Sequence, residues 1–208
     1  MPQAPTARLS DKVILGIDPG TLLMGYGILR IQGNRVSLLD AGHWRFRSTD
    51  SHLLRLSQIF KQTLALIQLH QPDELAIEAP FFAQNVQSLI KLGRAQGAAI
   101  AAALERDIPV FEYLPKKIKQ AVTGNGNASK QQVAAMLATL LQTPTDHFKS
   151  DATDALGAAY CHFLRMNDST TTAVNSTSTR TTKPKGTSSS KKKQAWEQFL
   201  RSNPDRQL

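Results

Sequence analysis

Two short apolar runs in this sequence each end at an acidic residue, and a proline follows each acid within two positions. The first run covers residues 13–17 and ends at Asp18, and the second covers residues 75–77 and ends at Glu78. Short apolar runs that are bounded by turn residues are typical of buried strands. The pattern therefore predicts two core strands, each of which holds one carboxylate on a rigid support at its end.

A third segment places two more acids at the start of an apolar helix. Asp151 and Asp154 are three residues apart. Residues with this spacing lie on the same face of a helix. The sequence thus offers four candidate acids, Asp18, Glu78, Asp151 and Asp154. The fold has to bring them together if they are to act as one site.

The apolar periodicity of the chain predicts an α/β fold. Strands are expected over residues 13–18, 24–31, 35–46, 74–78 and 109–113, and helices over 51–70, 84–106, 115–122, 130–141 and from 150 or 151 to about 165. The first three strands form a meander of hairpins, and the later alternation of helix and strand predicts a five-stranded mixed sheet flanked by helices on both faces. Strands 13–18 and 74–78 can then lie side by side.

Composition divides the chain into an arm, one domain and a tail. Residues 1–11 are polar, contain two prolines and are expected to form a flexible arm, while residues 12–166 hold the periodic segments. Residues 167–208 are rich in Ser, Thr and Lys and are predicted to be a disordered tail, because so few apolar residues cannot offset chain entropy. Within the tail, residues 194–202 form either a short helix or a chance apolar cluster.

The net charge of +9 favours a polyanionic partner, nucleic acid above all, although solubility alone also accounts for such a charge. The single cysteine, Cys161, excludes a disulfide or a cysteine-based zinc site within one chain. The sequence has no apolar signal core and no apolar stretch long enough to span a bilayer. We therefore expect a cytoplasmic protein without a membrane partner.

The four carboxylates suit a hard divalent cation such as Mg²⁺ or Mn²⁺. Two such ions about 3.5–4 Å apart can activate water and stabilise the leaving oxygen of a phosphodiester. Each acid also has a local explanation: Asp18 can initiate a turn, Glu78 can pair with a lysine, and Asp151 and Asp154 can cap or charge a helix start. The joint pattern favours the metal site, because strand ends need no capping acid.

Six short motifs of the chain resemble those of a known family. They are Gly-Ile-Asp-Pro-Gly at 16–20, Gly-Tyr-Gly at 25–27, Ala-Ile-Glu at 76–78, Lys-Leu-Gly-Arg-Ala-Gln-Gly at 91–97, Val-Phe-Glu-Tyr at 110–113 and Asp-Ala-Thr-Asp-Ala-Leu at 151–156. In this order and spacing they resemble the RuvC family of crossover-junction (Holliday junction) endodeoxyribonucleases. The resemblance implies a ribonuclease H-like fold and a homodimer that resolves four-way DNA junctions in recombination and repair. It implies paired symmetric nicks that leave 5′-phosphate and 3′-hydroxyl ends.

The resemblance also implies roles for individual residues. The acids Asp18, Glu78, Asp151 and Asp154 match the family's catalytic metal-binding acids, which implies Mg²⁺, two ions per site, with Mn²⁺ as a substitute. The family further implies the RuvA–RuvB branch-migration complex as a partner.

DNA contacts are expected from lysines on either side of the glycine-rich break at 124–127 and from one aromatic residue. Lys119 and Lys130 match family lysines near the scissile phosphate. Their position beside this break also favours phosphate contact, because backbone can approach a phosphate closely there. Lys117 is expected to extend this patch, with a solvated helix face as the alternative. Phe81 matches a family aromatic at the junction centre, where it can stack on an unpaired base.

Two more features bear on assembly and packing. Glycines 93 and 97 create a small-residue face on helix 84–106, against which either the chain's own sheet or the same helix of a second subunit can pack. His162, inside the final helix, is expected to be a structural polar residue.

Two alternatives to the nuclease come from other functional classes. The motif at 16–21 also resembles the first phosphate loop of actin-like ATPases and sugar kinases, but those proteins need two such domains and this chain holds one copy. A scaffold that binds junctions without cutting them is the non-enzyme alternative. Four acids beside a phosphate backbone argue against it, because they weaken binding.

Overall fold

The computed structural model of the chain describes residues 11–80, 85–143 and 150–172, so most of the predicted arm and tail, Phe81 and the segment 194–202 lie outside the described residues. The elements in chain order are β1 (Lys12–Asp18), β2 (Leu23–Gln32), β3 (Arg35–Arg45), α1 (His52–His70), β4 (Glu74–Glu78), α2 (Val86–Leu104), β5 (Val110–Tyr113), α3 (Pro115–Thr123), α4 (Lys130–Leu140) and α5 (Ser150–Thr172). No helix within these residues is long and apolar enough to cross a membrane.

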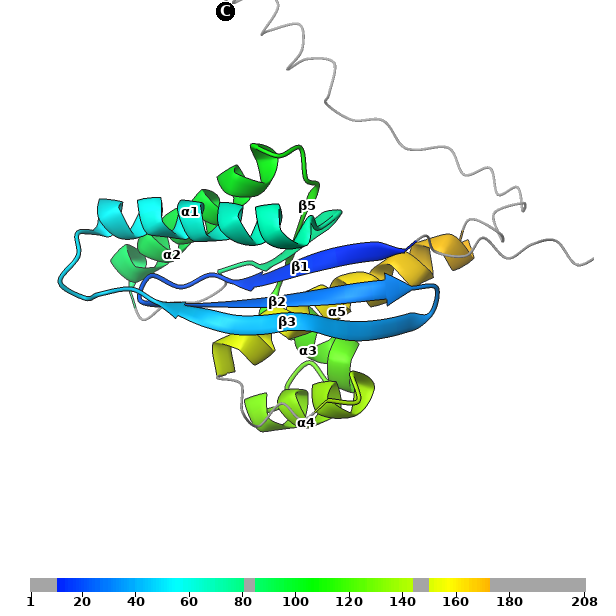
Figure 1. The fold of residues 1–208 in the computed structure, drawn as a ribbon. Helices are drawn as coiled ribbons and strands as arrows, with labels where there is room; N and C mark the ends of the chain where they lie inside the picture. Colours follow the sequence, from blue (N-terminus) through cyan, green and yellow to red (C-terminus); the bar gives the residue numbers. More distant parts are fainter. Residues whose placement is uncertain (1–10, 81–84, 144–149, 173–208) are drawn as a thin grey trace, which may run out of the picture. The chain divides into compact units, whose positions relative to one another are not determined.

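The strands form one five-stranded sheet in the order β3-β2-β1-β4-β5 (Figure 1). β1, β2 and β3 pair antiparallel as consecutive hairpins, and β4 lies parallel to both β1 and β5. The predicted mixed sheet is confirmed, including the neighbouring positions of the two strands that end in Asp18 and Glu78.

Helices cover both faces of the sheet, with α1 and α2 on one side and α3, α4 and α5 on the other (Figure 1). Successive residues of a strand point to opposite faces. In β1, Leu15 and Ile17 therefore join the core under α1 and α2, whereas Ile14 joins the core under α5. Asp18 is four residues after Ile14 and therefore points to the face that α5 covers. Glu78 points to the same face, because it is two residues after Ala76, which also belongs to the core under α5.

Two glycines let α5 lie directly against the sheet. A Cβ atom on Gly16 would stand 2.1 Å from the carbonyl oxygen of Ala155, and one on Gly25 would stand 1.9 Å from that of Asp151. Both distances are far below any real contact, so a side chain at either position would push the helix away. Gly16 and Gly25 thus fix how closely the start of α5 approaches β1 and β2.

The start of α2 and the end of α5 are two helix boundaries that differ from the predictions. α2 begins at Val86 rather than at 84, because the side chain of Asn85 accepts a hydrogen bond from the backbone N–H of Ser88 at 2.8 Å. α5 continues to Thr172 instead of ending near Arg165. Neither glycine nor proline occurs between 166 and 172, so nothing in the sequence breaks the helix there.

Candidate active site

Asp18 and Glu78 stand at the carboxyl ends of two neighbouring parallel strands. The register pairs Ile17 with Ile77, so the residues that follow them are also side by side. Both strands are buried up to these positions, and Asp18 and Glu78 are each only partly exposed. The sheet therefore holds two carboxylates next to one another on the face that α5 covers.

The first turns of α5 bring the other two acids to the same end of the sheet. Asp18 pairs with Gly25 across β1 and β2. The backbone of Asp151 lies directly over Gly25, and Asp154 follows one turn later on the same helix. The helix and the two strand ends thus place the four acids at the same end of the sheet.

Burial and mutual repulsion make the two strand-end acids reluctant to ionise. Burial raises the pKa of Asp18 well above its usual range, and the negative charges of Glu78, Asp154 and Asp151 raise it further. Burial also raises the pKa of Glu78 to about 7, with a further contribution from Asp154, while Lys130 and Lys119 act in the opposite direction. A nearby cation would relieve this repulsion.

Lys130 supplies part of that positive charge. Its Nζ lies 2.5 Å from Oδ2 of Asp154 and 3.1 Å from Oγ of Ser150. Burial lowers the pKa of Lys130, but the hydrogen bond to Asp154 and the charges of Asp154, Asp18 and Asp151 raise it more. Ser129 caps α4 in a capping box with Gln132, as its position in the sequence predicts, and so fixes Lys130 as the first residue of the helix.

The other predicted contact residues fall in different places. Lys119, on α3, is close enough for its charge to lower the pKa of Glu78. Lys117 is also on α3, and its carbonyl oxygen is 3.9 Å from Sγ of Cys161 on α5. The structure therefore brings Lys119 and Lys130 to the acids and places Lys117 beside a different part of α5.

The donor set of the acid cluster fits a hard divalent cation. All four candidate ligands are carboxylates, the groups that Mg²⁺ and Mn²⁺ prefer. In the described parts of the chain, however, no group of three or more Asp, Glu, His or Cys side chains stands close enough to hold a metal ion. Asp154 instead pairs with Lys130, so the acids need a rearrangement of side chains to close around a cation.

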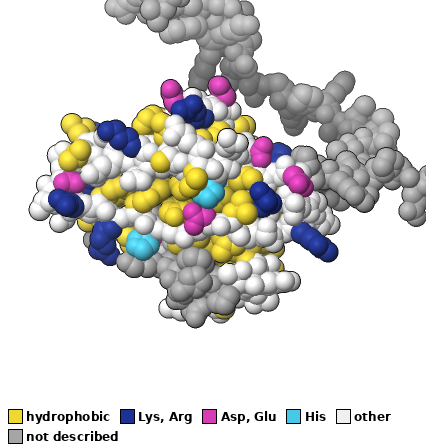
Figure 2. Space-filling view, in the orientation of Figure 1, with side chains coloured by type: hydrophobic (Ala, Val, Ile, Leu, Met, Phe, Trp, Pro, Cys, Tyr) yellow, Lys and Arg dark blue, Asp and Glu magenta, His cyan; other side chains and the backbone are white. Residues whose placement is uncertain are grey.

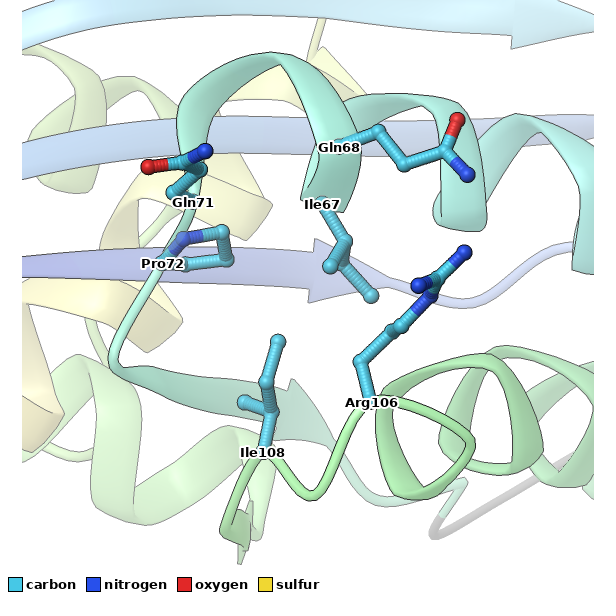
Figure 3. Close-up of a pocket in the computed structure, with 6 residues that line it drawn as sticks. All are labelled: Ile67, Gln68, Gln71, Pro72, Arg106 and Ile108. Carbon is cyan, nitrogen blue, oxygen red and sulfur yellow. The ribbon is translucent and has the colours of Figure 1, made fainter.

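A separate cleft of about 350 Å³ lies away from these acids (Figure 3). Its lining consists of Ile67, Gln68, Gln71, Pro72, Arg106 and Ile108. These residues precede β4 and β5 in the chain, whereas Asp18 and Glu78 stand at the carboxyl ends of β1 and β4. The cleft therefore lies at the opposite end of the sheet from the acids. It contains no carboxylate and is not the candidate site.

A protein-family model, that of the crossover junction endodeoxyribonuclease RuvC, matches residues 14–162, which include all four acids. The chain belongs to the RuvC family. Curated RuvC relatives include those of Porphyromonas gingivalis, 48% identical over 198 residues with 94% of this chain and 97% of the relative covered, and Bacteroides fragilis, 49% identical over 200 residues with 95% and 97% covered. Both are named crossover junction endodeoxyribonuclease RuvC.

Solved RuvC structures agree with this assignment. RuvC of Thermus thermophilus superimposes with a TM-score of 0.70 at 30% identity, covering 76% of this chain and 97% of that protein. The same RuvC in complex with a Holliday junction substrate gives a TM-score of 0.72 at 31% identity with the same coverage. The family resemblance that the motifs indicate and the ribonuclease H-like fold are thereby confirmed.

The sequence alone does not predict how α5 is seated on the sheet. Gly25 was part of a recognised motif, but its role as the contact point for Asp151 was not predicted. A glycine inside a strand commonly marks a close approach of another backbone. Gly16, Gly25 and Gly27 carry that signal, because all three fall within strands β1 and β2.

Proposed function

We propose that this chain resolves four-way DNA junctions by metal-dependent hydrolysis of phosphodiesters, with paired symmetric nicks. The observation that carries the proposal is the meeting of Asp18 and Glu78 with the first turns of α5, in a chain that belongs to the RuvC family. The products would carry 5′-phosphate and 3′-hydroxyl ends.

The four acids Asp18, Glu78, Asp151 and Asp154 are the proposed ligands of two Mg²⁺ ions, with Mn²⁺ as a substitute. Such a pair of ions supplies the Lewis acidity that activates water and neutralises the leaving oxygen. Asp18 is the best candidate to serve both ions, because three other carboxylates act on its charge. The buried strand behind Asp18 holds it in a fixed position while α5 supplies the other side of the site.

The pKa of Glu78, about 7, has a consequence for cation binding. A carboxylate has to be ionised to bind a metal, so binding at this site releases protons near neutral pH. We therefore infer that affinity for the cation rises with pH through the pKa of Glu78. An acid pair without a metal role would show no such dependence.

Lys130 and Lys119 are proposed to contact the DNA backbone near the bond that is cut. Lys130 is held at the start of α4 by Asp154, and cation binding by Asp154 would release its ammonium group toward a phosphate. Lys and Arg side chains are scattered on the face seen in Figure 2 rather than gathered into one stripe, so we assign DNA contact to the lysines beside the acids. Lys117 remains a proposed extension of this lysine patch, and Phe81 a proposed aromatic that stacks on an unpaired base at the junction centre.

A homodimer is proposed on the basis of an apolar stripe on α2. Val86, Ile90 and Leu104 are 72%, 50% and 59% exposed, and they lie on one side of the helix together with the glycines at 93 and 97. A Cβ atom on either glycine would meet nothing within 4 Å, so this side does not pack against the chain's own sheet. We infer that two copies pair through α2, which gives two sites for two nicks.

The family supports two further proposals. The RuvA–RuvB branch-migration complex is the proposed partner, since a resolvase has to act on a junction that a motor has moved. The relatives named above are bacterial, so we expect the chain to act in the cytoplasm, where bacterial DNA lies.

Substrate choice tests the proposed function. A synthetic four-way junction and a linear duplex of the same sequence are incubated with the protein and Mg²⁺. We expect nicks at symmetric positions in the junction and an intact duplex. Equal cutting of both would indicate a general nuclease, and turnover that requires ATP would favour the actin-like class instead.

A further inference from the structure

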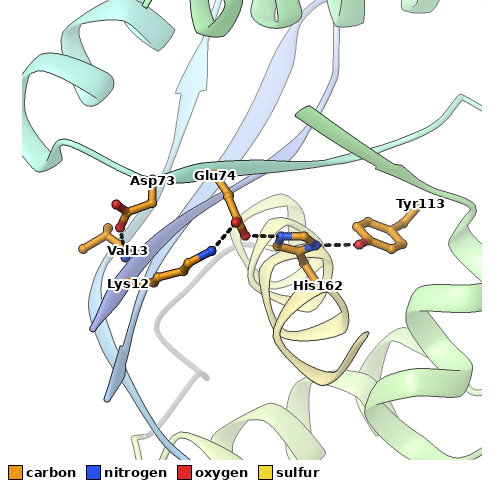
Figure 4. Close-up of polar contacts among 6 residues, drawn as sticks. All are labelled: Lys12, Val13, Asp73, Glu74, Tyr113 and His162. Carbon is orange, nitrogen blue, oxygen red and sulfur yellow. Dashed lines mark hydrogen bonds and ion pairs between the residues drawn. The ribbon is translucent and has the colours of Figure 1, made fainter. Parts of the chain in front are cut away.

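Four polar side chains form a continuous chain of contacts beneath α5, away from the acid cluster (Figure 4). Nε2 of His162 lies 2.6 Å from Oε2 of Glu74, and Nδ1 of the same ring lies 2.6 Å from the hydroxyl of Tyr113. Lys12 pairs with the other carboxylate oxygen of Glu74. His162 is only 3% exposed, and the contacts join β1, β4, α5 and β5 in one line.

The protonation states of these groups are mutually consistent. Burial lowers the pKa of His162, so the ring is neutral at pH 7 and has one N–H and one lone pair. Burial raises the pKa of Glu74, but hydrogen bonds from Lys12 and His162 lower it more, so the carboxylate only accepts. Burial raises the pKa of Tyr113 to about 12, so its hydroxyl keeps its proton.

One direction of hydrogen bonding follows. Nε2–H of His162 donates to Glu74, and the hydroxyl of Tyr113 donates to Nδ1 of His162. Lys12 completes the chain by donating to Glu74. Each donor faces an acceptor, so the neutral ring is held at both nitrogens and α5 is fixed in rotation and in height against the sheet.

Two members of this chain, His162 and Tyr113, connect it to the elements that carry the acid cluster. His162 lies two turns beyond Asp154 on α5, which is about 12 Å along the helix axis. Tyr113 pairs with Glu78 in the register of β4 and β5, and its carbonyl oxygen accepts the backbone N–H of Ala79 at 2.9 Å. His162 thus ties the helix of Asp151 and Asp154 to the strand residue that lies opposite Glu78.

We propose that His162 is a positioning residue, which through Glu74 and Tyr113 holds α5 and β5 so that the four acids can close around divalent cations. The proposal rests on the proposed function for its catalytic consequence. Replacing a buried hydrogen-bonded pair by apolar groups of the same shape can be nearly neutral or even stabilising. Stability alone therefore does not explain a polar chain at this place in the core.

The test compares variants that keep or remove the hydrogen bonds of His162. His162→Leu keeps the volume and loses both bonds, whereas His162→Gln keeps one donor and one acceptor on a neutral side chain. Tyr113→Phe removes a single donor. Tyr160→Phe is the matched control, because Tyr160 is a buried tyrosine on α5 outside this chain of contacts.

Three quantities are measured for each variant: Mn²⁺ affinity by titration calorimetry without DNA, the single-turnover nicking rate on a bound junction, and junction affinity in EDTA. We expect His162→Leu to lower both Mn²⁺ affinity and nicking rate by about 10–100-fold, the usual effect of losing a group behind the ligands. Junction affinity stays unchanged. His162→Gln regains most of the loss, Tyr113→Phe lies between, and Tyr160→Phe matches the wild type.

The proposal is overturned if a folded His162→Leu protein, as judged by thermal unfolding, has wild-type Mn²⁺ affinity and nicking rate, or if Tyr160→Phe loses as much. If His162→Leu does not fold, Mn²⁺ affinity and nicking rate are compared between His162→Gln and Tyr113→Phe. Wild-type values for both quantities in a folded Tyr113→Phe protein would then overturn the proposal. A wild-type chain that binds Mn²⁺ but cuts no junction would contradict the proposed function and not the role of His162. The Mn²⁺ affinities of the variants would still test whether His162 positions the acids.

Discussion

The carbonyl oxygen of Asp151 lies 1.9 Å from the point where a Cβ atom on Gly25 would stand. Gly25 is also the residue that pairs with Asp18 across β1 and β2. One glycine therefore sets the separation between a strand-end acid and the helix that carries two more. The geometry of the acid cluster depends on this contact at least as much as on the acids themselves.

Gly25→Ala is expected to displace the start of α5, because the new methyl group would overlap backbone atoms of Asp151. Overpacking of this kind costs about 1–3 kcal/mol of folding stability. We expect a lower unfolding midpoint and a loss of nicking larger than the loss of junction binding. Ser57→Ala, at an exposed position on α1 outside the α2 stripe, is the control and should lower neither quantity.

Glu78→Gln is expected to stabilise the metal-free protein at pH 8. The folded-state pKa of Glu78, about 7, is above its ordinary value of 4.5, so its contribution to stability is present below pH 4.5 and is lost as pH rises through 7. A shift of one pKa unit corresponds to about 1.36 kcal/mol, and solvent screening reduces that figure. We therefore expect Glu78→Gln to raise the free energy of unfolding at pH 8 by about 1–3 kcal/mol.

Thermal unfolding at pH 5 and pH 8 in EDTA measures this effect, and the gain should be much smaller at pH 5. Adding Mg²⁺ at pH 8 should then stabilise the wild type more than the variant, because a ligand that binds only the folded state raises stability. An equal difference between the two proteins at both pH values would argue against a raised pKa of Glu78.

Lys130→Ala is expected to impair catalysis more than folding. The Lys130 side chain as a whole is 62% exposed, and ion pairs of surface lysines contribute about 0–1 kcal/mol. Removing one group that stabilises charge in the transition state commonly costs about 100–1,000-fold in rate. We expect a loss in that range in the nicking rate and a fall of about 1 in the salt slope of junction binding. Lys61→Ala, on exposed α1 surface, is the matched control and should change neither quantity.

Ile90→Asp is expected to separate the proposed dimer without unfolding the chain. Ile90 is half exposed, so a charge there costs little in the monomer but places two like charges in an interface between two α2 helices. Light scattering at micromolar concentration should show a dimer for the wild type and a monomer for the variant. Leu69→Asp, on α1 and outside the stripe, should remain dimeric; a monomeric wild type with junction DNA present would refute the α2 pairing.

The sequence allows the sheet and the helices to be predicted, because each leaves a local signal, whereas the role of the four acids as one site stays a prediction. The apolar run before Asp18 and the turn after it mark a strand end, and Ser129 marks a helix start. The length of α5 was missed, since residues 166–172 lack apolar periodicity although nothing in them stops a helix.

Contacts between distant segments leave no comparable signal. His162 and Glu74 are 88 residues apart, and Lys130 and Asp154 are 24 apart, so no periodic pattern links either pair. His162 was expected to be a structural polar residue, and its burial agrees with that expectation. Its contacts with Glu74 and Tyr113, and the pairing of Tyr113 with Glu78, are visible only in the structure, where α5 crosses the sheet.

Cleavage of a synthetic four-way junction by the wild type and by Asp18→Asn in Mg²⁺, read at nucleotide resolution, tests the account most directly. The wild type should introduce symmetric nicks with 5′-phosphate and 3′-hydroxyl ends. Asp18→Asn should still bind the junction and should not cut it. Wild-type binding without nicks across several junction sequences, or normal cutting by Asp18→Asn, would contradict the account.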